Sequence, residues 1–194
     1  MRLANYIFIP NFFSEKECDR IKKEGQKRLE PACIFDQNLK DDEDPTPNLK
    51  RRNTNVSFFD GTSLIEDLLQ KAVNGIRDYA KKYYAIDITR AGLIQYAEYE
   101  KGMFYTWHTD SSPILGSEMV RDISASIILS KKNDYTGGSL QMVCPDNIED
   151  TVLTPQDVED QEQGTLIVFP SNMIHRVSTV TSGVRSSLVV WTWK

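Results

Sequence analysis

The chain has 194 residues, of which 40% are hydrophobic and 26% are charged, and its formal net charge is −5. This length is typical of one domain around one core, so we expect a single domain over residues 1–194. No apolar run approaches the ~20 residues of a membrane-spanning helix, and the negative charge offers no general attraction to nucleic acid. The composition therefore predicts a globular protein with neither a membrane nor a nucleic-acid partner.

The N-terminus and the cysteines bear on the cellular compartment. The short apolar stretch at the N-terminus meets Pro10 and charged residues too soon for a secretory signal. Cys18, Cys33 and Cys144 are odd in number and widely spaced, which favours reduced thiols over a disulfide framework or a zinc site. We therefore expect a cytoplasmic protein.

A strand and a helix are predicted at the start of the chain. Residues 5–10, NYIFIP, alternate aromatic and β-branched side chains and end at a proline, as in a strand. Ser14 and Glu17 then form a capping box, in which each side chain binds a backbone N–H at the first turn of a helix. We expect this helix to extend to about Leu29.

A polar segment, Asp36–Arg52, separates these elements from the next pair. It contains four consecutive acidic residues and two prolines. Long segments of this kind are often lids or binding loops, and we expect an exposed loop that covers a functional site. Residues 53–59 then predict a strand, and apolar residues at helical spacing predict a second helix over residues 64–83.

The second half of the chain is dominated by predicted strands. They are separated by turn signals at residues 100–102, 134–138 and 182–183. Two helices followed by about seven short strands fit an α+β fold, in which the sheets form a sandwich or a barrel against the helices. The predicted strands are residues 92–100, 103–110, 122–129, 139–143, 165–169, 174–180 and 184–193.

The chain has only two histidines, and one of them, His108, lies two residues before Asp110. Side chains two apart on a strand point to the same face, with Cα atoms about 6.5 Å apart, so both can bind one ion. His175 follows a predicted strand and turn that would return it to the first strand. Two imidazoles and one carboxylate leave metal positions open, as in non-haem Fe(II) oxygenases. Taken alone, the pair His108 and Asp110 is more often a polar surface contact than a metal site.

A cation, Arg185, begins the last predicted strand. If its face of the strand is the barrel interior, the guanidinium needs a carboxylate partner, because an unpaired buried charge is costly. A dicarboxylate ligand would supply this partner, bound bidentately by Arg185 and hydrogen-bonded by Ser187. The alternative is that Arg185 faces solvent and the tryptophans of the strand belong to the core. The residues that share its face by period two are Ser187, Val189, Trp191 and Trp193.

These residues occur in an order that is typical of a known family. Tyr99, Gly102, Tyr105, His108 and Asp110 are followed by ISASIILS, DYTGGSL and GTLIVFPSNMIHRVSTVTSGVRSSLVVW. The sequence resembles the Fe(II)/2-oxoglutarate-dependent dioxygenases, in particular their prolyl-4-hydroxylase-like branch. The resemblance implies a double-stranded β-helix, a jelly-roll or cupin-like barrel, braced by the two helices of the first half.

The resemblance also implies roles for the site residues. His108, Asp110 and His175 would hold Fe(II), and Arg185 would bind the distal carboxylate of 2-oxoglutarate. Tyr99 matches a position that lines the cosubstrate pocket, although a packed strand aromatic explains it equally well.

The activity that the resemblance implies is an O2-dependent hydroxylation. The expected substrate is a prolyl residue in a peptide or protein, with release of succinate and CO2 and with ascorbate as reductant. One alternative is an oxygenase of a free amino acid or another small molecule. Another is a module without catalysis that senses iron or 2-oxoglutarate.

Overall fold

The computed structural model describes residues 6–33, 48–59, 64–111, 120–143, 155–158 and 161–194. Within these ranges the α-helices are α1 (Glu15–Gly25) and α2 (Glu66–Tyr79), and the short helical segments are η1 (Gln26–Arg28), η2 (Ala80–Tyr84) and η3 (Lys132–Asp134). The first strands are β1 (Ile7–Ile9), β2 (Glu30–Pro31), β3 (Arg52–Asn53), β4 (Asn55–Phe59), β5 (Arg90–Ala91), β6 (Ile94–Tyr99) and β7 (Phe104–His108). The remaining strands are β8 (Ile123–Ile128), β9 (Tyr135–Gly137), β10 (Leu140–Val143), β11 (Pro155–Asp157), β12 (Leu166–Pro170), β13 (His175–Val177), β14 (Val180–Gly183) and β15 (Arg185–Trp193).

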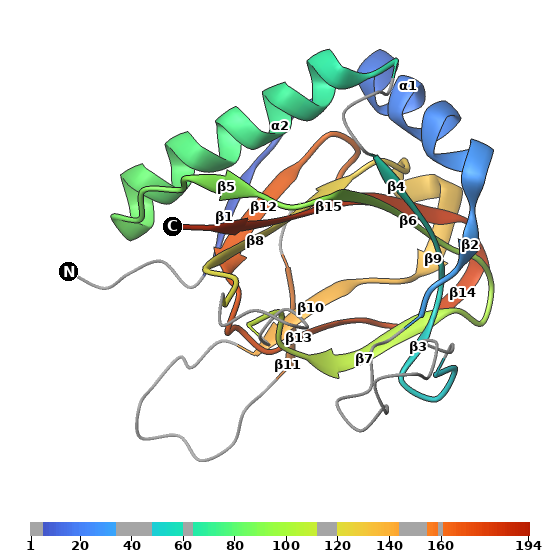
Figure 1. The fold of residues 1–194 in the computed structure, drawn as a ribbon. Coiled ribbons are helices and arrows are strands. Elements are labelled where there is room, and N and C mark those ends of the chain that lie inside the picture. The colour runs from blue at the N-terminus through green and yellow to red at the C-terminus, as the bar shows by residue number, and fades with distance from the viewer. Residues whose placement is uncertain (1–5, 34–47, 60–63, 112–119, 144–154, 159–160) are drawn as a thin grey trace, which may run out of the picture.

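Two antiparallel sheets face each other across a barrel (Figure 1). The larger sheet has the order β1-β12-β8-β15-β6-β4-β2, with β5 also paired to β15. The smaller sheet has the order β11-β10-β13-β7-β3, and β14 pairs with β9 in a separate ribbon. Strands that are neighbours in the sheets lie far apart in the sequence, which is the arrangement of a double-stranded β-helix.

Both α-helices lie on the outer face of the larger sheet (Figure 1). Helix α2 buries one apolar face that includes Leu69 and Ile76, and helix α1 contributes Ile21. These side chains pack against alternate residues of the sheet, such as Leu188 and Val190 of β15. The packing of the helices on the larger sheet therefore fixes which face of β15 points away from them and into the barrel.

A second apolar cluster lies between the two sheets. It contains residues of both, among them Ala97, Ile128, Met142, Ile167 and Val177. The barrel is therefore packed at its centre. These features confirm the predicted fold class, an α+β double-stranded β-helix braced by two helices.

The predicted capping box of the first helix is confirmed. The Ser14 side chain accepts a hydrogen bond from the Glu17 N–H, and the Glu17 carboxylate accepts one from the Ser14 N–H at 2.7 Å. The second predicted helix is also present and continues from α2 into the π-helical turn η2 as far as Tyr84.

Three local predictions in the second half are wrong. The predicted turn at residues 134–138 contains β9, and the predicted strand 174–180 is divided into β13 and β14. The predicted turn at Ser182 and Gly183 instead ends β14, which pairs with β9 about 45 residues earlier. Turn residues such as Gly137, at φ +70°, mark the chain reversals, but a pairing over this distance has no local signature.

The predicted covering loop, Asp36–Arg52, lies mostly outside the described residues. At its described end, Arg52 is buried in β3, so the prediction of an exposed loop is wrong at this residue. Among the described residues, no helix combines the length and the hydropathy that crossing a bilayer requires.

Candidate functional site

Three polar side chains meet at one end of the barrel. His108 ends β7 and lies directly opposite His175, the first residue of β13, in the antiparallel register of the smaller sheet. Asp110 follows two residues after His108, and its backbone N–H donates to the carbonyl of Ser171 at 2.8 Å. All three side chains are buried. The sheet register therefore brings together residues that the sequence separates by more than 60 positions.

The protonated nitrogen of each imidazole is fixed by the backbone. Nδ1 of His108 lies 2.8 Å from the carbonyl oxygen of Thr106, and Nδ1 of His175 lies 2.9 Å from that of Met173. A carbonyl oxygen only accepts, so each Nδ1 must carry the proton. Each Nε2 then presents its lone pair to the site, which is the form of histidine that binds a metal.

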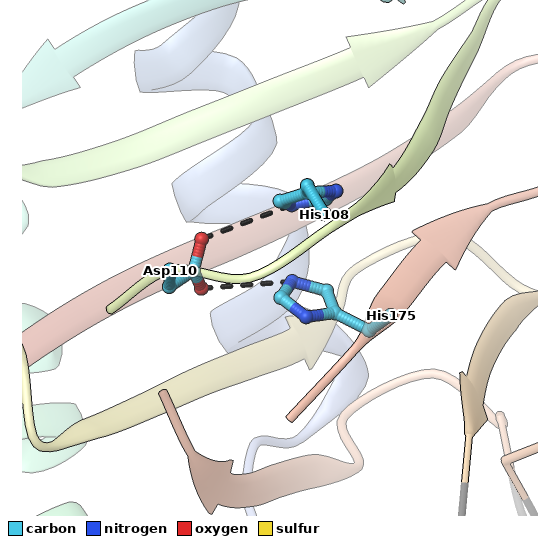
Figure 2. A group of neighbouring side chains, drawn as sticks. All are labelled: His108, Asp110 and His175. Carbon is cyan, nitrogen blue, oxygen red and sulfur yellow. Dashed lines mark ion pairs between the residues drawn. The ribbon is translucent and has the colours of Figure 1, made fainter. Parts of the chain in front are cut away.

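The carboxylate of Asp110 faces both imidazoles, whose ring centroids are 4.1 Å apart (Figure 2). Its oxygens are 3.7 Å from Nε2 of His108 and 3.6 Å from Nε2 of His175, as Figure 2 shows. Burial and the neighbouring His175 lower the pKa of His108 to about 3, so this imidazole is neutral near pH 7. Burial acts to raise the pKa of Asp110, but the two histidines, together with the polar groups of Ser124 and Trp191, keep the pKa below its ordinary value.

The donor set of this cluster fits a divalent transition metal. One ligand atom from each side chain lies within 4.8 Å of the others, so a single ion can contact all three. Two neutral imidazoles and one carboxylate suit Fe(II), and three protein ligands on one side leave other positions open. A polar surface contact, the simpler interpretation of His108 and Asp110, does not agree with the burial of both residues.

Arg185 is among the most deeply buried side chains of the described residues, with 1% of its surface exposed. Its Nη1 donates to the hydroxyl of Ser187 at 3.1 Å, whereas Nε and Nη2 are buried without a hydrogen-bond partner. No described carboxylate forms an ion pair with it. The prediction that Arg185 faces the barrel interior is confirmed, and the alternative that it faces solvent is wrong. Two free N–H groups on a buried cation fit a carboxylate ligand.

Tyr99 lies directly opposite Arg185 in the β6–β15 register. It is buried, and its ring centroid is 5.5 Å from Cζ of Arg185. Gly138, at φ +63°, also lies against Arg185, because a Cβ atom there would be 3.0 Å from Cδ of Arg185. Gly138, the second glycine of the DYTGGSL stretch, thus leaves room for the arginine side chain.

Three residues near the triad were not assigned a role by sequence reasoning. The ring of Tyr105 stacks on that of His108, with 3.6 Å between the ring centroids. Cζ of Arg52 lies 4.7 Å from the centroid of the Tyr105 ring. Arg121 lies 4.3 Å from the ring centroid of Trp191. Arg52 was expected in the exposed loop Asp36–Arg52, whereas the β3–β7 pairing places it opposite Tyr105.

Sequence comparison identifies the family of proteins that this chain resembles. Residues 94–193 match the family model described as the 2OG-Fe(II) oxygenase superfamily. A PKHD-type hydroxylase of Rippkaea orientalis is 35% identical over 103 residues, which are 53% of this chain and 43% of that protein. The chain thus spans about half the length of the curated relatives it matches.

Solved structures resemble the whole described barrel. A Pseudomonas putida prolyl-4-hydroxylase has a TM-score of 0.73 and 21% identity, covering 98% of this chain and 92% of that one. A Trichoplax adhaerens prolyl hydroxylase, in complex with a hypoxia-inducible-factor peptide, has a TM-score of 0.71 and 16% identity, with coverage of 97% and 83%. At these identities the likeness shows the shared fold.

Proposed function

This chain belongs to the 2OG-Fe(II) oxygenase superfamily, and from that premise we propose that it is an Fe(II)- and 2-oxoglutarate-dependent dioxygenase. The proposed reaction is hydroxylation of a prolyl residue in a peptide or protein, with release of succinate and CO2. One observation carries the proposal: the cluster of His108, Asp110 and His175 shares one barrel with a buried arginine, Arg185, that pairs with no carboxylate of the described residues.

In this proposal His108, Asp110 and His175 hold Fe(II), and the carbonyls of Thr106 and Met173 orient the two imidazoles. When bound, ferrous iron together with 2-oxoglutarate and O2 supplies the oxidation of an unactivated C–H bond, coupled to decarboxylation of the cosubstrate. The chain itself fixes the ligands, excludes water by burial, and positions the substrates. Ascorbate is proposed as the reductant that keeps the iron ferrous.

The proposed cosubstrate site is formed by Arg185, Ser187 and Tyr99. The unpartnered Nε and Nη2 of Arg185 would donate two parallel hydrogen bonds to the distal carboxylate of 2-oxoglutarate. Ser187 fixes the guanidinium through Nη1, and Tyr99 covers it from the neighbouring strand. The negative carboxylate would compensate a buried cation that no described carboxylate pairs with.

The substrate class is supported by the neighbours of the fold. The P. putida and T. adhaerens proteins are named as prolyl hydroxylases, and the second was solved with a peptide. We therefore propose a proline-containing peptide or protein as the substrate of this chain.

An assay of succinate formation tests the proposal. The protein is incubated with ferrous iron, ascorbate and 2-oxoglutarate, and with proline-containing peptides, free amino acids or neither. The masses of the peptides are then measured by mass spectrometry. We expect succinate to form with a peptide that gains one oxygen atom. Succinate formed with a free amino acid and with none of the peptides would indicate the small-molecule alternative. A complete absence of succinate would favour a sensing module and contradict the proposed activity.

A further inference from the structure

Arg52 presents a buried positive charge beside the metal ligands. It is 8% exposed and lies opposite Tyr105 in the β3–β7 register, so that Tyr105 separates it from the ring of His108. Its Nη2 donates to Oε1 of Gln95 at 3.1 Å, and its Nε is buried without a hydrogen-bond partner. No described carboxylate pairs with it. The stack on Tyr105 occupies only the flat face of the guanidinium and leaves N–H groups on its edge.

Arg121 presents a second cation on another wall of the site. It precedes β8, and its guanidinium covers the ring of Trp191, a residue of the barrel-facing side of β15. Its Nε is buried without a partner, and it makes no hydrogen bond or ion pair with any other described residue. Burial lowers the pKa of Arg121, while the nearby charge of Asp110 opposes that shift. The Asp110 carboxylate, however, is one of the three proposed metal ligands, and it forms no ion pair with Arg121.

The charges around the site do not balance once its expected occupants are present. The charge of a ferrous ion cancels that of the 2-oxoglutarate dianion, and the charge of Asp110 cancels that of Arg185. The two histidines are neutral in the metal-binding form. The positive charges of Arg52 and Arg121 remain, although the chain as a whole is negative. A buried cation without a counter-charge is unfavourable, and no described residue supplies one, so an anionic partner is expected from outside the described residues.

We infer that Arg52 and Arg121 bind carboxylate groups of the substrate, on either side of the reacting C–H bond. The inference rests on the proposed function and deepens it, since it assigns a preference for acidic residues next to the target proline. A guanidinium edge binds a carboxylate through two parallel N–H groups, and local positive potential also speeds the approach of anionic peptides. The carboxylate of a free amino acid offers the same chemistry, and the experiment below separates the two sources.

The experiment compares three matched peptides in which the residues flanking one proline are aspartate, asparagine or lysine, together with free L-proline. Binding is measured by fluorescence anisotropy of labelled peptides on the manganese- and 2-oxoglutarate-loaded protein without oxygen. Free proline, which carries no label, competes against the bound aspartate peptide. Turnover is measured in parallel as kcat and KM with iron. For the wild type we expect the aspartate peptide to bind at least about tenfold more tightly than the asparagine peptide, since hydrogen bonds to charged groups are the strong ones.

Variants show whether the arginines act on the substrate or only support the site. Arg52→Gln and Arg121→Gln are each expected to lose about tenfold in affinity for the aspartate peptide and to leave the asparagine peptide nearly unchanged. Arg121→Glu is expected to prefer the lysine peptide, which a merely structural role would not produce. Arg176→Gln is the matched control, because Arg176 also lies over an aromatic ring, at 4.5 Å from Trp107, but on the strand face opposite to His175.

The outcomes separate this inference from the proposed function. Hydroxylation of the aspartate and asparagine peptides with equal affinity and equal kcat/KM would overturn the inference and leave the proposed function intact. If free proline bound tightly and the three peptides bound with equal affinity, the inference would also be overturned, in favour of an amino-acid substrate. Oxidation of none of these compounds would overturn both. Because buried Arg52 is the riskier change for folding, the half-buried Arg121 variants decide the question if Arg52→Gln does not fold.

Discussion

Individual residues at the site differ in how far their surroundings could be predicted. The period of two in a strand was enough to put His108 and Asp110 on one face, and the scarcity of histidine pointed to His175 as the third ligand. The tautomers could not be predicted, because they depend on carbonyl groups two residues before each histidine. Arg52 was assigned to the surface, since the run of basic residues around it carries no information about burial.

Arg185 allows a direct prediction at this scale. Arg185→Lys keeps the charge but loses the paired N–H groups that are free in the wild type, so we expect KM for 2-oxoglutarate to rise about tenfold or more. Ser187→Ala removes only the hydrogen bond to Nη1 and should raise KM by a smaller factor. Initial rates of succinate formation at varied 2-oxoglutarate measure both. An unchanged KM in Arg185→Lys would contradict the proposed cosubstrate site.

Secondary-structure elements were predictable where one face of an element is buried and the other is not. The helices α1 and α2 follow such patterns. The strands β6 and β8 of the larger sheet are instead buried on both faces, and they were predicted as short runs separated by turn signals. The short ribbon of β9 and β14 was not predicted, because its two strands are three and four residues long and meet only through tertiary structure. Local composition marks where a chain turns, but it does not state which strand comes to lie beside it.

The contact between helix α1 and the larger sheet gives a prediction at the scale of elements. A Cβ atom on Gly25 would lie 2.6 Å from Cδ1 of the fully buried Tyr96. We expect Gly25→Ala to lower the free energy of unfolding by about 1–3 kcal/mol through overpacking, even though alanine is the better helix former by about 1 kcal/mol. Urea unfolding measures the change.

Lys23→Ala is the control for this prediction, because Lys23 is exposed on the same helix. Its free energy of unfolding should stay within about 0.5 kcal/mol of the wild type. A Gly25→Ala protein as stable as wild type would show that the contact of α1 with Tyr96 is looser than described.

The whole molecule is organised by two cores that share the larger sheet. One lies under the helices, and the other lies between the sheets. Strand β15 separates them, with Leu188 and Val190 facing the helices and Arg185 and Ser187 facing the barrel. The alternation along β15 was readable in the sequence, whereas the strand order that brings His108 beside His175 was not. The family resemblance supplied that order.

Ferrous-iron binding tests the central claim of this account most directly. In anaerobic equilibrium dialysis, we predict one ferrous ion per wild-type chain and a loss of affinity of at least about 100-fold in His108→Ala and in His175→Ala. Arg185→Lys, which changes the cosubstrate site alone, should still bind one ion per chain. Full iron affinity in either histidine variant would contradict the assignment of His108, Asp110 and His175 as the metal ligands.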